Sequence, residues 1–342
     1  MQKKTVVGWD IGGVNTKVAL VEDQRLVRAC ARPFELQRAP DTLVAVLRDL
    51  ATEAGAPADS PAVVHAITMT AELSQMFRTK REGVAFVIDG VAAAFPSSAA
   101  RVFTVDGRFV DPAEARSRPL AVAAANWAAT AALVARRYQD ALLVDIGTTT
   151  ADVIPIVGGA VVARGRTDPE RLASGELVYT GALRTPAEAI ASHVIIGGER
   201  VGVSAEGFAL AGDVHVWRGD LTPADYTVPT PDGRPATREF AGERLARLIC
   251  GDREMLDAAR VSEIADGIAE AQVERVAEAI RRVCARHAPL RIAVVTGLGA
   301  FLATIAACRV GLSVALLADH LGADAARYAP AAAVALLLDV AS

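Results

Sequence analysis

The chain has 342 residues, of which 52% are hydrophobic, and its formal net charge is −4. This mixed charge without a basic stripe excludes nucleic acid as an expected partner. The cysteines form no CxxC pair, which excludes a metal knuckle or disulfide scaffold and is typical of a reducing cytoplasm. Residues 120–135 are small and apolar but too short to span a bilayer. We therefore expect a cytoplasmic protein with no membrane partner.

The N-terminal third predicts a meander of three short strands over residues 5–9, 17–21 and 26–31. A helix follows, begun by Asp41 and ended by Gly55, with its apolar residues on one face. Further runs predict strands over residues 63–68 and 84–88 and one helix over residues 120–137.

The second half repeats the meander, with predicted strands at residues 141–144, 152–157 and 160–164. This internal duplication predicts two similar lobes. Residues 213–238 contain four prolines and predict a long loop. After the loop the pattern predicts a helix from Ser262 to Ala288, strands at 291–296 and 313–317 around a helix at 301–307, and a C-terminal helix at 322–340.

The segment VVGWDIGGVNTKVALV, residues 6–21, places a carboxylate, two glycines, small polar side chains and a lysine between two strands. Glycines at a turn let an anion approach the backbone N–H groups, and Lys17 supplies positive charge for phosphate. Asp10 would repel phosphate unless Mg²⁺ lay between them. The segment therefore predicts half of a magnesium–phosphate cradle. Taken alone, it is equally consistent with an ordinary hairpin.

A second segment, VDIGTTTAD at residues 144–152, repeats this composition after a strand. Two matched turns favour phosphate binding over two unrelated hairpins. A third motif, TGLGA at residues 296–300, also follows a strand. None of the three is a Walker A sequence or has GxGxxG spacing. Asp152 either positions a water or hydroxyl group or caps the turn.

These motifs resemble the phosphate loops of the actin, hexokinase and heat-shock chaperone superfamily. The resemblance covers the chain in order and implies an α/β fold of two duplicated ribonuclease-H-like lobes around a central cleft, the actin-like ATPase fold. It implies lobe I at residues 1–138 with the first phosphate loop. Lobe II, residues 139–342, would hold the second loop and an adenosine-side glycine motif, with the C-terminal helix completing the interlobe connection.

Other segments are similar to the hydantoinase/oxoprolinase branch of that superfamily, above all GELVYTGALRTP at residues 175–186. WDIGGVNTK, ANWAATA at 125–131 and the segment 72–83 resemble a small subgroup that makes the coenzymes methanofuran and methylofuran. Ala71, just before Glu72, stands where the resemblance implies a glycine. The resemblance implies a transferase that joins an aminomethyl-furan-methyl diphosphate to the phenol oxygen of a glutamyl-tyramine or tyrosine-type substrate, releasing pyrophosphate.

The expected site residues divide by role. Catalytic roles are expected for Asp10, Lys17, Asp145 and Asp152, with Mg²⁺ held by Asp10 and Asp145. Phosphate contacts are expected from Gly12, Gly13, Asn15, Thr16, Lys17, Gly147, Thr148, Thr149, Thr150, Gly297 and Gly299. Substrate contacts are expected from Glu72, Lys80, Arg81, Glu176, Tyr179, Arg184 and Trp217.

Simpler interpretations stay open for several of these residues. Lys80 and Arg81 are also consistent with a solvated charged face, and Arg184 with a surface ion pair. His193 and His215 are expected to pack as polar groups, because no histidine has a partner at metal-ligand spacing.

The expected partners are small molecules: the furan diphosphate and the phenolic glutamyl compound. Whether ATP binds stays open, and ATP is not expected to be consumed. The alternative is an ATP-dependent small-molecule kinase or a hydantoinase/oxoprolinase-type amidohydrolase that uses the same cradle, with a nucleotide-sensing switch protein ranked after both. The sequence leaves open whether the chain forms a homo-oligomer.

Overall fold

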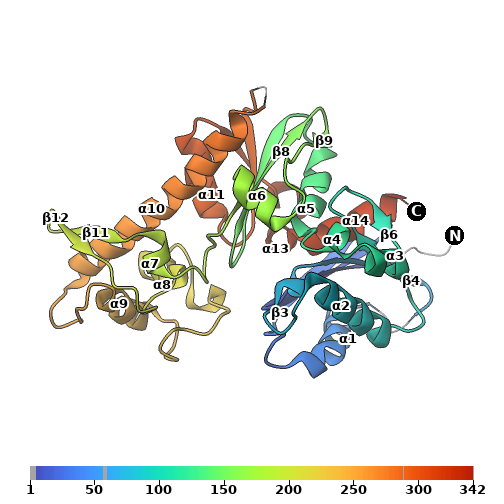
Figure 1. The fold of residues 1–342 in the computed structure, drawn as a ribbon, viewed down its shortest axis with the longest axis horizontal. Coiled ribbons are helices and arrows are strands. Elements are labelled where there is room, and N and C mark those ends of the chain that lie inside the picture. Colours follow the sequence, from blue (N-terminus) through green and yellow to red (C-terminus); the bar gives the residue numbers. More distant parts are fainter. Residues whose placement is uncertain (1–4, 57–59, 288, 342) are drawn as a thin grey trace. The chain divides into compact units, whose positions relative to one another are not determined.

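The structure is a computed structural model that describes residues 5–56, 60–287 and 289–341. The chain divides into two compact units. Unit 1 consists of Met1–Leu143, Ile154–Ser174 and Ala315–Ser342, and unit 2 of Val144–Val153 and Gly175–Val314. Figure 1 follows the chain from its blue N-terminal strands to its red C-terminal helices. Within the described residues, no helix combines the length and apolar composition that a membrane span requires.

The first sheet belongs entirely to unit 1, and its strand order is β3-β2-β1-β4-β5-β6. Strands β1, β2 and β3 form an antiparallel meander, whereas β4 pairs parallel to β1 and β5 parallel to β4. The elements up to the second sheet are β1 (Thr5–Ile11), β2 (Asn15–Glu22), β3 (Arg25–Pro33), η1 (Pro40–Thr42), α1 (Leu43–Ala54), β4 (Val63–Met69), η2 (Ala71–Leu73), α2 (Lys80–Ala94), β5 (Ala99–Phe103), β6 (Phe109–Val110), α3 (Pro112–Ser117), α4 (Pro119–Val122) and α5 (Asn126–Ala135).

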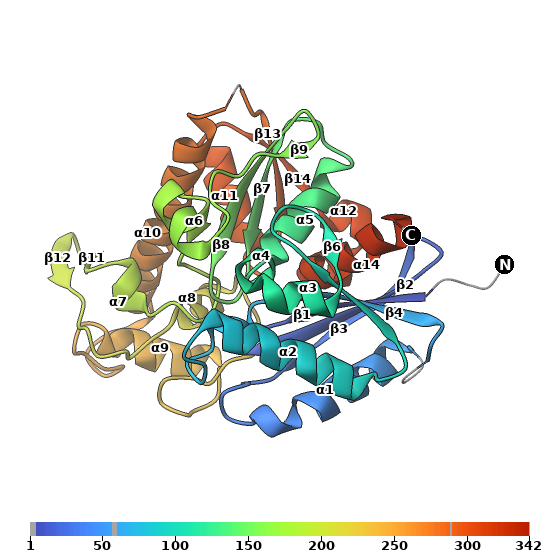
Figure 2. The same cartoon turned by 45° about the vertical axis from the view of Figure 1, so that its right-hand side comes forward.

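The two faces of the first sheet are covered by different helices. Because successive strand residues point to opposite faces, Val7, Trp9 and Ile11 enter one core cluster together with residues of α1 and α2. The opposite face carries Gly8, where a Cβ would fall on the backbone of the C-terminal helix α14 (Ala329–Ala341). Figure 2 shows α1 and α2 on one side of these strands and α14 on the other. A small residue at Gly8 therefore lets α14 pack directly on β1.

The second sheet has the order β10-β8-β7-β13-β14, with β9 also pairing with β8. The order β9-β8-β7-β13-β14 repeats β3-β2-β1-β4-β5, which confirms the predicted duplication. Its elements and those that follow are β7 (Ala141–Ile146), β8 (Ala151–Val157), β9 (Ala160–Val161), α6 (Asp168–Ser174), β10 (Leu177–Val178), α7 (Ala187–Ile190), β11 (His193–Ile196), β12 (Glu199–Gly202), α8 (Ala211–Arg218), η3 (Pro223–Asp225), α9 (Arg238–Arg247), α10 (Ala258–Cys284), β13 (Ile292–Thr296), α11 (Ala300–Arg309), β14 (Ser313–Leu316), α12 (Ala318–Leu321) and α13 (Ala323–Arg327).

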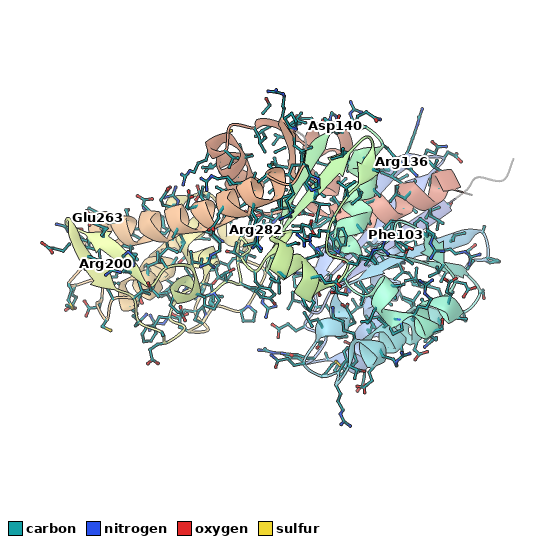
Figure 3. All side chains as sticks on the ribbon, turned by 45° about the horizontal axis from the view of Figure 1, so that its top comes forward. Phe103, Arg136, Asp140, Arg200, Glu263 and Arg282 are labelled. Atoms are coloured by element: carbon teal, nitrogen blue, oxygen red, sulfur yellow. The ribbon has the colours of Figure 1, made fainter. Side chains whose placement is uncertain are left out.

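Unit 2 contains the long helix α10. Its predicted start at Ser262 was wrong, because the helix begins four residues earlier, at Ala258. Asp257 caps it by accepting from the N–H of Arg260. The predicted end at Ala288 lies outside the described residues. Figure 3 labels Glu263 near the start of α10 and Arg282 near its end. The N–H of Gly197 donates to Glu263 across 2.9 Å, which ties the β11–β12 hairpin to the helix.

Several predicted elements were wrong. Residues 84–88, predicted as a strand, lie in helix α2. This helix begins after Thr79, whose side chain caps it by accepting from the N–H of Glu82. The predicted helix at 120–137 is interrupted at Ala124, whose φ of +51° separates α4 from α5. Asp41 lies in a 3₁₀ turn, and Thr42 precedes α1.

Two further predicted elements each consist of two parts in the structure. The predicted loop at 213–238 begins as helix α8, so its irregular part starts at Gly219. The predicted C-terminal helix consists of α13 and α14.

Candidate functional site

The first glycine loop sets a charged pair side by side. The register of β1 and β2 places Asp10 directly opposite Lys17. Cross-strand partners lie on the same face of a sheet, and here Lys17 Nζ donates to Asp10 Oδ2 across 2.6 Å. The Asp10 side chain is buried, and its Oδ1 has no hydrogen-bond partner in the described part of the chain. A buried carboxylate oxygen without a donor is a ready ligand for a cation.

The backbone of this loop is held through its carbonyl groups. The N–H of Gly12 donates to Asn15 O across 3.0 Å and closes the turn. Gly13 O and Val14 O accept from the N–H groups of Leu36 and Phe34. Across the described residues, no hydrogen bond is recorded from the N–H of Gly13 or Val14, so these donors stay available to an anion.

The second glycine loop has the same construction. The N–H of Gly147 donates to Thr150 O across 2.9 Å. Its carbonyls are held by residues 181–184, which we call the strap: Ala182 donates to Gly147 O, and Leu183 and Arg184 donate to Thr148 O. The described structure records no bond from the N–H groups of Thr148 and Thr149. In both loops, therefore, carbonyl groups accept hydrogen bonds from another segment of the chain, and the N–H groups of two residues are left open.

The third glycine motif lies against the second loop within unit 2. The N–H of Gly299 donates to Ile146 O across 2.8 Å. Gly297 has a φ of +87°, and a Cβ there would fall on Asp145 Oδ1 and Ile146 O. Only glycine allows both the positive φ and the lack of space for a Cβ. Gly297 therefore lies against Asp145 and Gly299 against Ile146. Asp152, the second residue of β8, is buried and paired with Leu177.

A buried carboxylate lies just beyond the strand that runs beside β1. The N–H of Thr70 donates to Ile11 O, and Glu72 follows two residues later in η2. Glu72 is 1% exposed, and neither of its carboxylate oxygens has a hydrogen-bond partner in the residues that the structure covers. Lys80 Nζ lies 3.5 Å from Oε1, which makes an ion pair but is too long for a good hydrogen bond.

Helix α2 and helix α6 complete this cluster in unit 1. Lys80, the first residue of α2, also donates to Asp168 Oδ2 across 2.7 Å. At Gly83 a Cβ would approach the Glu72 backbone to 2.5 Å, so glycine lets α2 pack onto it. Burial raises the pKa of Glu72 to about 7, and Lys80 offsets only part of that rise. Glu72 is therefore suited to exchange a proton near neutral pH.

The other predicted substrate residues lie in varied surroundings. Arg81 is exposed and donates to Arg116 O across 3.4 Å. Glu176 is buried beside Arg286 Nη2 at 3.4 Å. Tyr179 is 58% exposed, and the Arg184 side chain is also exposed. Both exposed side chains are accessible to a ligand in this structure.

Trp217 is buried in α8 and not in a loop. Its indole N–H donates to Ser262 Oγ across 3.0 Å, and the guanidinium of Arg238 lies 4.2 Å from the ring centre. The expected contact of Trp217 with substrate stays a prediction, and it would require the ring to exchange Arg238 for a ligand.

Sequence reasoning missed Asp168. It stands at the first residue of a short helix, where acidic residues are common, so nothing in the local pattern marks it as a partner of Lys80.

The donor set at Asp10 suits magnesium better than zinc. Among the described residues, no group of three or more histidine, cysteine, aspartate or glutamate side chains could enclose a metal ion. Mg²⁺ needs no such cage, since it keeps several waters and binds through one or two carboxylates and substrate phosphates. The partnerless Oδ1 of Asp10 fits that mode.

Comparison with known proteins shows two similar enzymes. The chain is 36% identical over 298 residues to (4-{4-[2-(gamma-L-glutamylamino)ethyl]phenoxymethyl}furan-2-yl)methanamine synthase of Methanocaldococcus jannaschii, covering 87% of each chain. It is 31% identical over 204 residues to the synthase of that name from Methanococcus vannielii, covering 58% of this chain and 91% of that one.

The fold itself is also found among solved structures. The nucleotide-free structure of acetone carboxylase matches 96% of this chain and 70% of its own, with a TM-score of 0.58 and 12% identity. The α/β fold with two mixed sheets is thus the predicted actin-like one. The hydantoinase/oxoprolinase family model matches residues 64–338. The chain belongs to the hydantoinase/oxoprolinase family.

Proposed function

We propose that this protein is a transferase that forms an aryl ether, in methanofuran or methylofuran biosynthesis. The name of its relatives describes a product in which a phenol oxygen is bonded to a furan-methyl carbon. The proposed substrates are an aminomethyl-furan-methyl diphosphate and a phenolic glutamyl-tyramine or tyrosine-type compound. The phenol oxygen bonds to the methyl carbon, the bond from that carbon to diphosphate breaks, and pyrophosphate leaves with the electron pair.

The observation that carries this proposal is the shared construction of the two glycine loops. Each presents open backbone N–H groups beside hydroxyl or amide side chains, which are donors for phosphate oxygens. Donors fixed in advance stabilise the negative charge that develops on a departing diphosphate. We infer that Lys17 adds a positive charge on the same group.

Magnesium is the proposed cofactor, and Asp10 and Asp145 are the residues proposed to hold it. When bound, Mg²⁺ would neutralise charge on the leaving diphosphate. The buried Oδ1 of Asp10 supports this role, because it otherwise lacks a partner among the described residues.

The phenol also needs a proton acceptor, because its pKa is ~10. We propose that Glu72 takes this proton as the ether bond forms and later returns it to water. Glu72 follows the strand that runs beside β1 at the carboxyl edge of the first sheet, where ligands of open α/β sheets commonly bind. The Lys80 amine pairs with this carboxylate and is partly exposed, and we propose that it also contacts the phenol.

A second candidate function is an ATP-dependent reaction of the kinase or amidohydrolase type. The observation that favours it is the third glycine turn, since Gly297 lies against Asp145 and Gly299 against Ile146, and a diphosphate alone does not require this turn. The acetone carboxylase that shares this fold is described as acting in ATP-dependent carboxylation.

One experiment separates the two candidates. Purified protein is incubated with Mg²⁺ and the furan diphosphate, with and without the phenolic compound, and pyrophosphate and the ether are measured by coupled assay and mass spectrometry. We expect both products in equal amounts without ATP. Ether formation that requires ATP, or ATP hydrolysis without any ether, would overturn the transferase proposal.

A further inference from the structure

A fully buried histidine lies behind the strap of the second loop. His215, on α8, has an exposed fraction of 0%. Its Nδ1 lies 3.1 Å from Asp220 Oδ2, and its Nε2 lies 2.9 Å from Gln272 Oε1 on helix α10. Both ring nitrogens therefore face oxygen atoms.

The orientation of Gln272 is fixed by its other contacts. Its amide nitrogen lies 2.9 Å from Gly181 O and 2.9 Å from Thr180 Oγ1. A backbone carbonyl can only accept, so the Gln272 amide group must direct its NH₂ toward Gly181. Its oxygen consequently faces His215, and the His215 Nε2 must carry a hydrogen.

The other ring nitrogen faces the Asp220 carboxylate. Asp220 accepts from Arg218 Nε across 2.9 Å, and the contact with His215 helps to lower the pKa of Asp220 against the effect of burial. Phe301 packs against the His215 ring at a centroid distance of 4.9 Å.

These contacts link three parts of unit 2. Gly181 is the first residue of the strap, and a Cβ there would approach the Thr149 backbone to 2.5 Å. Phe301 lies in α11, two residues after Gly299 of the third glycine motif. The buried His215 ring therefore contacts the helix behind the third turn and, through Gln272, the strap behind the second loop.

We propose that His215 and Gln272 are positioning residues that hold the strap against the second phosphate loop. The His215 ring orients the Gln272 amide, and the amide fixes Gly181, so that the N–H groups of Ala182, Leu183 and Arg184 stay directed at the loop carbonyls. The consequence for phosphate binding rests on the proposed function, but the structural role does not.

The first test measures the strap directly. Gln272→Met keeps the side-chain length and removes both hydrogen-bonding groups, and His215→Phe fills the same space without the ring nitrogens. We expect amide hydrogen exchange of Ala182 and Arg184 to quicken by about tenfold or more in Gln272→Met, because loss of a buried hydrogen bond is worth roughly that factor. His193→Gln, at an exposed histidine on β11, is the matched control and should change neither amide.

The second test concerns ligand binding. Magnesium pyrophosphate should bind the Gln272→Met variant more weakly, with the Michaelis constant for the phenolic substrate unchanged. Unchanged exchange at the strap in a folded Gln272→Met would overturn the inference. A wild-type protein that binds no pyrophosphate would instead refute the proposed function.

Discussion

Replacing Glu72 by glutamine should make the protein more stable and less active. The carboxyl group is 1% exposed and lacks a hydrogen-bond partner in the described part of the chain, and burial raises its pKa from 4.5 to about 7. The folded chain therefore binds this proton more tightly than the unfolded chain. Between these two values stability falls as the pH rises, and above the folded pKa the full penalty applies.

The magnitude follows from that shift. At about 1.36 kcal/mol per pKa unit, the penalty for ionising Glu72 is ~3 kcal/mol above neutral pH. The side chain is too deeply buried for solvent to screen this value. Glutamine removes the charge but leaves an amide without a partner, so we expect Glu72→Gln to gain about 1–3 kcal/mol near pH 8. Near pH 5 most of that difference should vanish, because wild-type Glu72 is then largely protonated.

Urea unfolding of both proteins at the two pH values measures this difference, and steady-state kinetics measure its consequence. Loss of a general base typically costs about 10²–10⁴ in rate, so kcat should fall by that range in Glu72→Gln. Glu254→Gln, at an exposed carboxylate, is the control and should change neither quantity. A variant that is less stable than wild type near pH 8, or fully active, would refute the assignment of Glu72 as a strained proton acceptor.

Four other predictions concern the loops. Asp10→Asn and Asp145→Asn should each lose activity by orders of magnitude with folding near wild type, because an amide keeps the shape without the charge; wild-type turnover at limiting Mg²⁺ would exclude the metal role. Lys17→Ala should weaken inhibition by pyrophosphate more than binding of the phenol, since the lysine is proposed as a charge on the leaving group; unchanged inhibition would place Lys17 elsewhere. Asp152→Asn should strengthen metal-free pyrophosphate binding by about tenfold, because one repelling charge is removed; calorimetric titration with and without Mg²⁺ checks this, and equal affinities would show that Asp152 does not face the phosphate. Replacing residues 229–235 by a short Gly/Ser connector should raise the Michaelis constant for the phenol and leave pyrophosphate affinity unchanged, and an unaltered Michaelis constant would show that this segment does not bind the phenol.

The predictions from sequence succeeded where local pattern decides the structure. The meander and its glycine turns are set by short-range alternation and turn residues, so the register that places Asp10 opposite Lys17 follows from two adjacent strands. In helix α2 the local pattern was not enough to predict the structure. Its run AFVI, residues 85–88, is apolar and short, and such a run does not distinguish a strand from a buried helix.

The candidate site was only partly predictable because much of it depends on distant pairs. Lys80 meets Asp168 across 88 positions, and Gln272 meets Thr180 across 92. Neither pair has a sequence spacing that marks it. His215 looked like a solitary polar residue because its partners come from two other segments of the chain.

The two glycine loops share their backbone design but differ in charge, and that difference gives them different roles. Counting from the strand-end aspartate, Lys17 and Asp152 stand at the same place in the two loops. The first loop carries an ion pair, Asp10 with Lys17, in which Asp10 Oδ1 has no hydrogen-bond partner among the described residues. The second loop has carboxylates, Asp145 and Asp152, at both of these places. Because a lysine attracts phosphate and an aspartate repels it, we propose that this change from lysine to aspartate gives the two duplicated turns different parts in binding the diphosphate.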